Sequence, residues 1–128
     1  MNLLLDTVTF LWWVTDDPAL SGPAGEAIRD PARKVYLSAV SAWEISVKYG
    51  LGKLPLPEDP ATLVPRLRVD SGIQELGLTE AAVFRILKLP ALHRDPFDRM
   101  LICQAIEHCL TLVTPDEAVR QYPIRTLW

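Results

Sequence analysis

The sequence predicts an α/β protein in which a mainly parallel β-sheet is covered by helices on both faces. Short apolar runs alternate with helical patterns along the chain, and these runs are apolar throughout instead of alternating with polar residues. A strand that is buried on both faces has this composition, and helical crossovers make neighbouring strands parallel. The chain has 128 residues and contains no repeat or linker, so one domain spanning 1–128 is expected.

The first half of the chain should contain two strands and four helices. The apolar runs at 2–5 (NLLL) and 35–38 (VYLS) have the length of short buried strands. Helical patterns occupy 9–14, 21–30, 41–50 and 60–71. Ser21 lies near the start of the second helix, Gly50 ends the third, and Pro65 should break or kink the fourth.

The second half should add three strands and three helices. Strands are expected at 73–76, 110–114 and 124–127, the last at an edge of the sheet. Helices are expected at 79–89, from about 96 to 109, and over the segment PDEAVRQY. Thr79 is placed to cap the first of these helices.

Composition excludes several classes of protein. Cys103 and Cys109 fall in one expected helix, six positions or about 600° apart, so they should stay reduced, as in the cytoplasm. Asp6 interrupts the opening apolar run, so neither a membrane span nor a signal peptide is expected. The net charge is −3, so any chemistry on nucleic acid must depend on local Lys and Arg side chains or on bound cations.

Two aspartates follow apolar strands. Asp6 ends the run MNLLLD, and Asp116 follows the strand LTLVT after one turn residue. In open α/β sheets, ligands bind at the carboxyl edge, where both acids should lie. The alternative is that each acid only caps the helix that follows it.

Two more aspartates lie in the stretch HRDPFDR. Asp95 precedes Pro96, which is typical of a helix N-cap followed by proline at the first helical position. Asp98 then lies at the third helical position, where the helix dipole favours an acid. Asp98 shares its face, however, with the apolar residues Leu101, Ile102, Ala105, Ile106 and Cys109, while Gln104, Glu107, His108 and Thr111 form a polar stripe on the other side. An unpaired carboxylate at the edge of a core is costly, so Asp98 should have a partner.

The fourth candidate acid is Glu44. On a helix it lies on the same side as Val40, Val47 and Leu51. The alternative is an exposed i,i+4 pair with Lys48, worth a few tenths of a kcal/mol.

Together these residues place four carboxylates near one edge of the sheet. Two carboxylates about 4 Å apart repel each other by roughly 4 kcal/mol at an effective dielectric constant near 20. Four ionised carboxylates therefore need cations, and oxygen ligands favour Mg²⁺ or Mn²⁺.

The sequence resembles PIN-domain ribonucleases, in particular the VapC-type toxins of toxin–antitoxin pairs. The resemblance runs nearly end to end through LLLDT, SAWEISVKYGLGKLPLP, HRDPFDRMLICQA and LTLVTPDEA. It implies a three-layer α/β/α sandwich, metal binding by Asp6, Glu44, Asp98 and Asp116, and a supporting hydroxyl at Thr114. One departure is Val8, which stands where relatives of this subgroup commonly have histidine.

The resemblance implies a Mg²⁺- or Mn²⁺-dependent endoribonuclease that hydrolyses RNA phosphodiester bonds. Asp6, Asp98 and Asp116 would be metal ligands, and Glu44 would bind the metal or orient the attacking water. Arg94, Arg99 and Lys48 are candidates for phosphate contacts, with ordinary solvated charges as the alternative, and Asp95 is a supporting residue. His93 is expected to be a turn residue. A cognate antitoxin and a homodimer are implied by the resemblance alone.

Two alternatives stay open. A catalytically silent PIN-like module would bind RNA or protein without turnover, since fold does not determine function. A receiver-like phosphoacceptor domain would need an acid pair after the first strand, a central aspartate and a late lysine. The strand at 35–38 contains no aspartate and no lysine follows Lys88, so this alternative is disfavoured.

Overall fold

The computed structural model describes residues 1–128 and contains one five-stranded sheet. The strands are β1 (Leu3–Leu5), β2 (Val35–Ser38), β3 (Gln74–Leu76), β4 (Thr111–Val113) and β5 (Thr126–Leu127). Their order is β3-β2-β1-β4-β5, and all four pairings are parallel. The parallel sheet predicted from the sequence is therefore confirmed, with the last strand at an edge.

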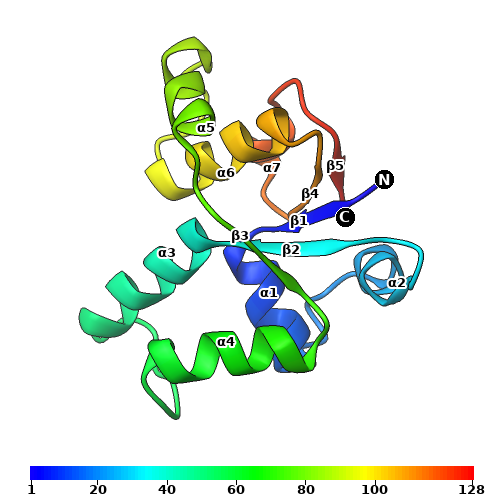
Figure 1. Cartoon of the computed structure of the whole chain (residues 1–128), viewed down its shortest axis with the longest axis vertical. Coiled ribbons are helices and arrows are strands. Elements are labelled where there is room, and N and C mark those ends of the chain that lie inside the picture. The colour runs from blue at the N-terminus through cyan, green and yellow to red at the C-terminus, as the bar shows by residue number, and fades with distance from the viewer.

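Helices cover both faces of this sheet. They are α1 (Thr7–Val14), α2 (Gly22–Arg29), α3 (Ala39–Gly50), α4 (Pro60–Asp70), α5 (Glu80–Phe84), the 3₁₀ turn η1 (Arg85–Lys88), α6 (Pro96–Glu107) and α7 (Glu117–Arg120). In Figure 1, α5, α6 and α7 lie on one side of the strands, and α1 and α4 lie on the other. None of these helices has the length and apolar character required to cross a membrane.

The strand β1 contributes to a separate core on each face. Leu3 and Leu5 belong to a cluster with residues of α1, α2 and α4, whereas Leu4 belongs to a cluster with residues of α6 and α7. All three leucines are fully buried. Because successive side chains of a strand point to opposite faces, a strand covered on both faces must be apolar at every position. The three-layer α/β/α arrangement is thus confirmed.

Some expected boundaries were wrong. The helix expected at 79–89 divides into α5 and η1, and α4 continues through Pro65 without a break. Helix α6 ends at Glu107, because Cys109 adopts a left-handed conformation (φ 54°) that stops the helix. Cys109 is therefore exposed, whereas Cys103 is buried inside α6, and both cysteines are free.

The expected polar stripe of α6 was also wrong at Gln104. This side chain is fully buried: its Oε1 accepts a hydrogen bond from the Ser38 hydroxyl, and its Nε2 donates to the carbonyl of Gly77 (3.3 Å). Ser38 is the N-cap of α3, where its Oγ accepts from the Val40 N–H (2.9 Å). Gln104 thus ties the middle of α6 to the first turn of α3.

Replacing Gln104 with alanine is expected to lower the free energy of unfolding by about 1–3 kcal/mol, because the buried partners of its amide lose their hydrogen bonds. Urea denaturation monitored by circular dichroism measures this change. The matched control is Gln121→Ala, since Gln121 is exposed and its loss should change stability by no more than about 0.5 kcal/mol. Equal stability of the two variants would contradict the structural role of Gln104.

Candidate active site

The candidate site lies at the carboxyl ends of β1 and β4, the neighbouring strands at which the strand order reverses. Asp6 directly follows β1, and Asp116 follows β4 through a two-residue connection. Crevices at such reversal points are the usual ligand sites of open α/β sheets. The parallel topology therefore brings two of the expected acids to one edge.

Asp6 is both a helix cap and a buried acid. Its Oδ1 accepts a hydrogen bond from the Thr9 N–H (2.8 Å), so the alternative of a cap for α1 is realised. The residue is only 5% exposed. Burial raises the pKa of the Asp6 carboxyl and the charge of Glu44 raises it further, while hydrogen bonds with Thr114 and Thr9 partly offset the increase.

Glu44 is buried on α3 and engaged at both oxygens. Its Oε1 accepts from the Thr7 hydroxyl (2.7 Å), and its Oε2 pairs with Lys48 Nζ (2.5 Å). The Glu44–Lys48 pair considered from the sequence therefore exists. It is not an exposed pair, because Glu44 is 5% exposed and only the lysine reaches solvent.

The expected neighbours of Glu44 on α3 were partly wrong. Val47 and Leu51 are exposed, at 39% and 64%, and the buried face consists of Val40, Ser41, Glu44 and Ile45. Residues spaced at i, i+1, i+4 and i+5 cover a wider stripe than the one expected from i, i+7 and i+11. Glu44 is nonetheless on the inner side of α3.

Asp95 caps α6 as predicted. Its Oδ1 accepts hydrogen bonds from the N–H groups of Phe97 (2.8 Å) and Asp98 (3.3 Å), and Pro96 occupies the first helical position. Asp95 thereby stabilises the first turn of α6, which carries Asp98.

Asp98 has the most perturbed carboxyl of the site. Burial, followed by the charges of Asp95, Asp6 and Glu44, raises its pKa from 3.8 to about 7, and His93 opposes this shift. Only 19% of the Asp98 side chain is exposed. The carboxylates of α3, α6 and the end of β1 therefore lie close enough together to resist the ionisation of Asp98.

The pKa of Asp116 is shifted in the opposite direction. Burial works to raise its pKa, but hydrogen bonds from His93 and from the Ala118 N–H outweigh burial, and the pKa is lowered. Asp116 caps α7 through Ala118 (2.9 Å), and its own N–H donates to the Thr114 hydroxyl (3.1 Å). Thr114 is fully buried and contacts Asp6 as well as Asp116.

The sequence predicted only a turn residue at His93 and did not place it in the site. It lies in the loop before α6, yet its Nε2 is 2.9 Å from Asp116 Oδ2 and 3.2 Å from Asp98 Oδ2. Burial disfavours the charged ring, but the hydrogen bond to Asp116 and the charges of Asp98, Asp116 and Asp95 outweigh burial and raise the pKa of His93. A histidine two residues before a helix cap was the only local signal for this contact.

The three basic candidates differ in their surroundings. Lys48 is engaged by Glu44, and Arg94 is exposed in the loop before α6. Arg99 donates from Nη2 to the Leu89 carbonyl (3.4 Å), and its Nε is buried without a partner. Arg94 is thus the one of the three with no hydrogen-bond or ion-pair partner within the chain.

The donor set fits a divalent cation. One ligand atom from each of His93, Asp98 and Asp116 lies within 4.8 Å of the others, and Asp6 and Glu44 act electrostatically on Asp98. Burial and the neighbouring acids disfavour the ionised form of Asp98, and a bound cation would counter both effects. Oxygen-rich sets of this kind suit Mg²⁺ or Mn²⁺.

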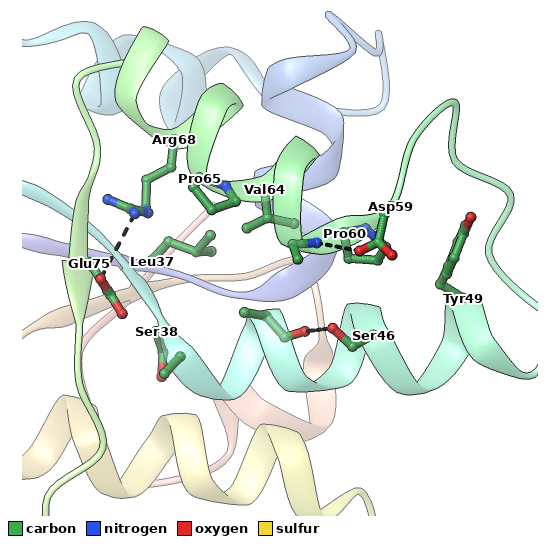
Figure 2. Close-up of a pocket in the computed structure, with 13 residues that line it drawn as sticks. Leu37, Ser38, Ser46, Tyr49, Asp59, Pro60, Val64, Pro65, Arg68 and Glu75 are labelled. Carbon is green, nitrogen blue, oxygen red and sulfur yellow. Dashed lines mark hydrogen bonds and ion pairs between the residues drawn. The ribbon is translucent and has the colours of Figure 1, made fainter.

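The pocket in Figure 2 is separate from the acids. It is a groove of about 360 Å³ between α3 and α4, and none of the four carboxylates lines it. Its two acids are already engaged, since Asp59 caps α4 through the Ala61 N–H (2.8 Å) and Glu75 lies 3.9 Å from Arg68. The groove therefore offers no unpaired charge for catalysis, and the acids remain the candidate site.

Comparison with known proteins agrees with the fold. The chain is 43% identical over 54 residues to Ribonuclease VapC16 of Mycobacterium tuberculosis, which covers 42% of this chain and 38% of that protein. It is 27% identical over 122 residues to Ribonuclease VapC22 of the same organism, covering 94% and 92%.

A crystal structure of VapBC2 from Rickettsia felis, bound to a DNA fragment from their promoter, contains a similar chain. Its TM-score is 0.74 at 17% identity, with coverage of 99% of this chain and 98% of that chain. The family model described as the PIN domain matches residues 3–124. With nearly the whole chain matched and the α/β/α architecture in place, the protein belongs to the PIN domain family.

Proposed function

We propose that this protein is a Mg²⁺- or Mn²⁺-dependent endoribonuclease toxin of a toxin–antitoxin pair, in which Asp6, Glu44, Asp98 and Asp116 hold the cation. The observation that carries the proposal is the gathering of acids at this edge of the sheet: ligand atoms of Asp98 and Asp116 lie within 4.8 Å of each other, and Asp6 and Glu44 are buried. The neighbouring acids contribute to a pKa of about 7 for Asp98. Acids with perturbed pKa values at a strand-order reversal are typical of functional sites. The names of the two VapC relatives support RNA as the substrate.

Each acid is held in place by the chain before any substrate arrives. Thr9 fixes Asp6, and Thr114 fixes the backbone of Asp116. When bound, a divalent cation supplies a water of lowered pKa and polarises a phosphoryl oxygen. Glu44, held by Thr7 and Lys48, would bind the cation or orient the attacking water.

Basic side chains around the acids would bind the RNA backbone. Arg94 is exposed beside the start of α6, and a guanidinium there matches the geometry of a phosphate. Lys48 and Arg99 are secondary candidates, because both side chains already have partners within the chain. The net charge of −3 makes such local groups necessary.

The proposed protein partners are an antitoxin and a second copy of this chain. The match to a VapBC2 complex supports the first, as do the VapC names of the relatives. For the second, Trp43, Val47 and Leu51 expose apolar surface along α3, which is common at interfaces. A cytoplasmic location fits the two free cysteines.

Removing divalent cations is expected to stop RNA cleavage. Purified protein in excess EDTA should cleave a mixed RNA substrate no faster than a blank, and adding Mg²⁺ or Mn²⁺ in excess should restore cleavage. Gel analysis of end-labelled RNA measures the rate, and separate titrations with each cation identify the more effective one. Cleavage that persists in EDTA would refute the proposed metal site.

The alternative of a catalytically silent module predicts a different result for the same purified protein. It is favoured if calorimetry detects Mg²⁺ binding while none of a panel of structured and unstructured RNAs is cleaved. The nuclease proposal expects both binding and cleavage.

A further inference from the structure

We propose that His93 is a positioning residue, whose Nε2–H group holds the carboxylates of Asp98 and Asp116 together for the divalent cation without binding the cation itself. This inference rests on the proposed metal site. It goes beyond that site because His93 is one of three residues whose possible ligand atoms lie close together, and the inference makes it a hydrogen-bond donor instead of a metal ligand.

The tautomer of His93 follows from its two contacts. The Asp95 backbone N–H donates to His93 Nδ1 at 3.0 Å, so Nδ1 must be the ring nitrogen without hydrogen. In the neutral ring the single N–H is then at Nε2, which lies 2.9 Å from Asp116 and 3.2 Å from Asp98. An ionised carboxylate only accepts hydrogen bonds, and therefore Nε2 donates to both acids.

The same contact argues against ligation by His93. A histidine that binds a metal uses an unprotonated nitrogen and donates its other N–H to an acceptor. If Nε2 of His93 became unprotonated, Nδ1 would carry the hydrogen and would face the N–H of Asp95. Two donors would then be opposed, and the helix cap that includes Asp95 would be disturbed.

The backbone of His93 is anchored to the segment that carries Asp116. The N–H groups of Leu92 (3.0 Å) and His93 (2.9 Å) both donate to the hydroxyl of Tyr122. Tyr122 is 3% exposed and follows α7, whose N-cap is Asp116. The His93 ring therefore bridges the starts of α6 and α7 from a fixed position.

The position of His93 between Asp98 and Asp116 affects the repulsion between the two carboxylates. Two carboxylates near 4 Å apart repel by roughly 4 kcal/mol at an effective dielectric constant of 20, and a shared N–H donor reduces the repulsion. Donors that orient metal-binding carboxylates commonly change metal affinity by about 10–100-fold when they are removed. His93 should therefore act on cation affinity through Asp98 and Asp116.

The first test is the tautomer of His93 in ¹⁵N-labelled wild-type protein at pH 8, read from two-bond ¹H–¹⁵N correlations. The chain has only two histidines, so the His108→Gln variant assigns the signals. We expect a protonated Nε2 and an unprotonated Nδ1 both without and with saturating Mg²⁺. Transfer of the hydrogen to Nδ1 on adding Mg²⁺ would show ligation and overturn the inference.

The second test is Mg²⁺ affinity by calorimetry. His93→Ala should weaken binding by about 10–100-fold. His93→Gln, whose amide N–H replaces the Nε2–H donor, should recover most of that loss, and His108→Ala should bind as wild type. An unchanged affinity in His93→Ala, or an equal loss in both His93 variants, contradicts the positioning role.

The two proposals fail in distinguishable ways. If the wild-type protein binds no Mg²⁺, the proposed function falls, and this inference falls with it. If the wild type binds Mg²⁺ but the His93 variants do not differ from it, only the inference falls. Should His93→Ala fail to fold, the tautomer measurement on the wild type decides alone.

Discussion

Replacing Asp98 with asparagine is expected to reduce divalent-cation-dependent RNA cleavage by roughly 100- to 1,000-fold, the loss typical of removing one preorganised electrostatic group. The same variant should be more stable than wild type in EDTA at pH 8. The wild-type carboxyl ionises there despite a pKa raised to about 7, which costs up to about 4 kcal/mol relative to its ordinary value of 3.8. The amide carries no charge and avoids that cost.

This pairing of lost activity with gained stability distinguishes a functional acid from a structural one. Activity is measured on end-labelled RNA and stability by urea denaturation in EDTA. The control is Asp59→Asn, an isosteric change at the N-cap of α4, where asparagine caps as well as aspartate. It should alter neither quantity. If Asp98→Asn loses stability together with activity, the acid holds the fold and the assignment is wrong.

The free energy of unfolding of the metal-free protein is expected to fall by roughly 3 kcal/mol between pH 5 and pH 8. The folded pKa of Asp98 is about 7 and its unfolded value is near 3.8, so the folded state binds the extra proton in this range. Stability is then fully present below the unfolded pKa and is lost as the pH rises through the folded one. The raised pKa values of Asp6 and His93 act in the same direction.

Asp116 acts at lower pH with the opposite sign. Its folded pKa is lowered, so its contribution is present above the unfolded value and is lost only as the pH falls through the folded one. The window from pH 5 to 8 therefore isolates the groups with raised pKa values.

Urea denaturation at several pH values in EDTA measures how the free energy of unfolding changes with pH. The Asp98→Asn variant should lose most of this pH dependence. Adding Mg²⁺ at pH 8 should restore about 3 kcal/mol at a concentration 100 times its dissociation constant. A wild-type profile that is flat over this range, or that rises, would contradict the crowding of acids around Asp98.

The local features of the fold were predictable from the sequence. Ser21, Thr79 and Asp95 were expected at or near helix starts, and each accepts a hydrogen bond from an N–H group two or three residues ahead. Such bonds depend only on neighbours in the chain, and for this reason short motifs reveal them. The continuous apolar strands likewise indicated a parallel sheet, because burial on both faces leaves no position for a polar side chain.

The site was only partly predictable. That Asp6 and Asp116 lie at the same edge of the sheet was inferred from parallel topology, and the burial of Glu44 and Asp98 from helical periodicity. That their strands are neighbours came from the structure. The resemblance to a known family added their proposed roles. Periodicity misplaced Gln104 because its partner Ser38 is 66 positions away and makes a polar side chain acceptable in the core.

By itself, then, the sequence determined the α/β class, the helix caps and the set of candidate acids, since these depend on spacing and nearest neighbours. Only the tertiary structure decided that His93 contacts Asp98 and Asp116, that the Glu44–Lys48 pair forms with only the lysine exposed, and that the pKa of Asp98 is raised to about 7. The reason is physical: electrostatic interaction and desolvation depend on distance in space, and the chain brings these groups together only when the sheet and its helices have assembled.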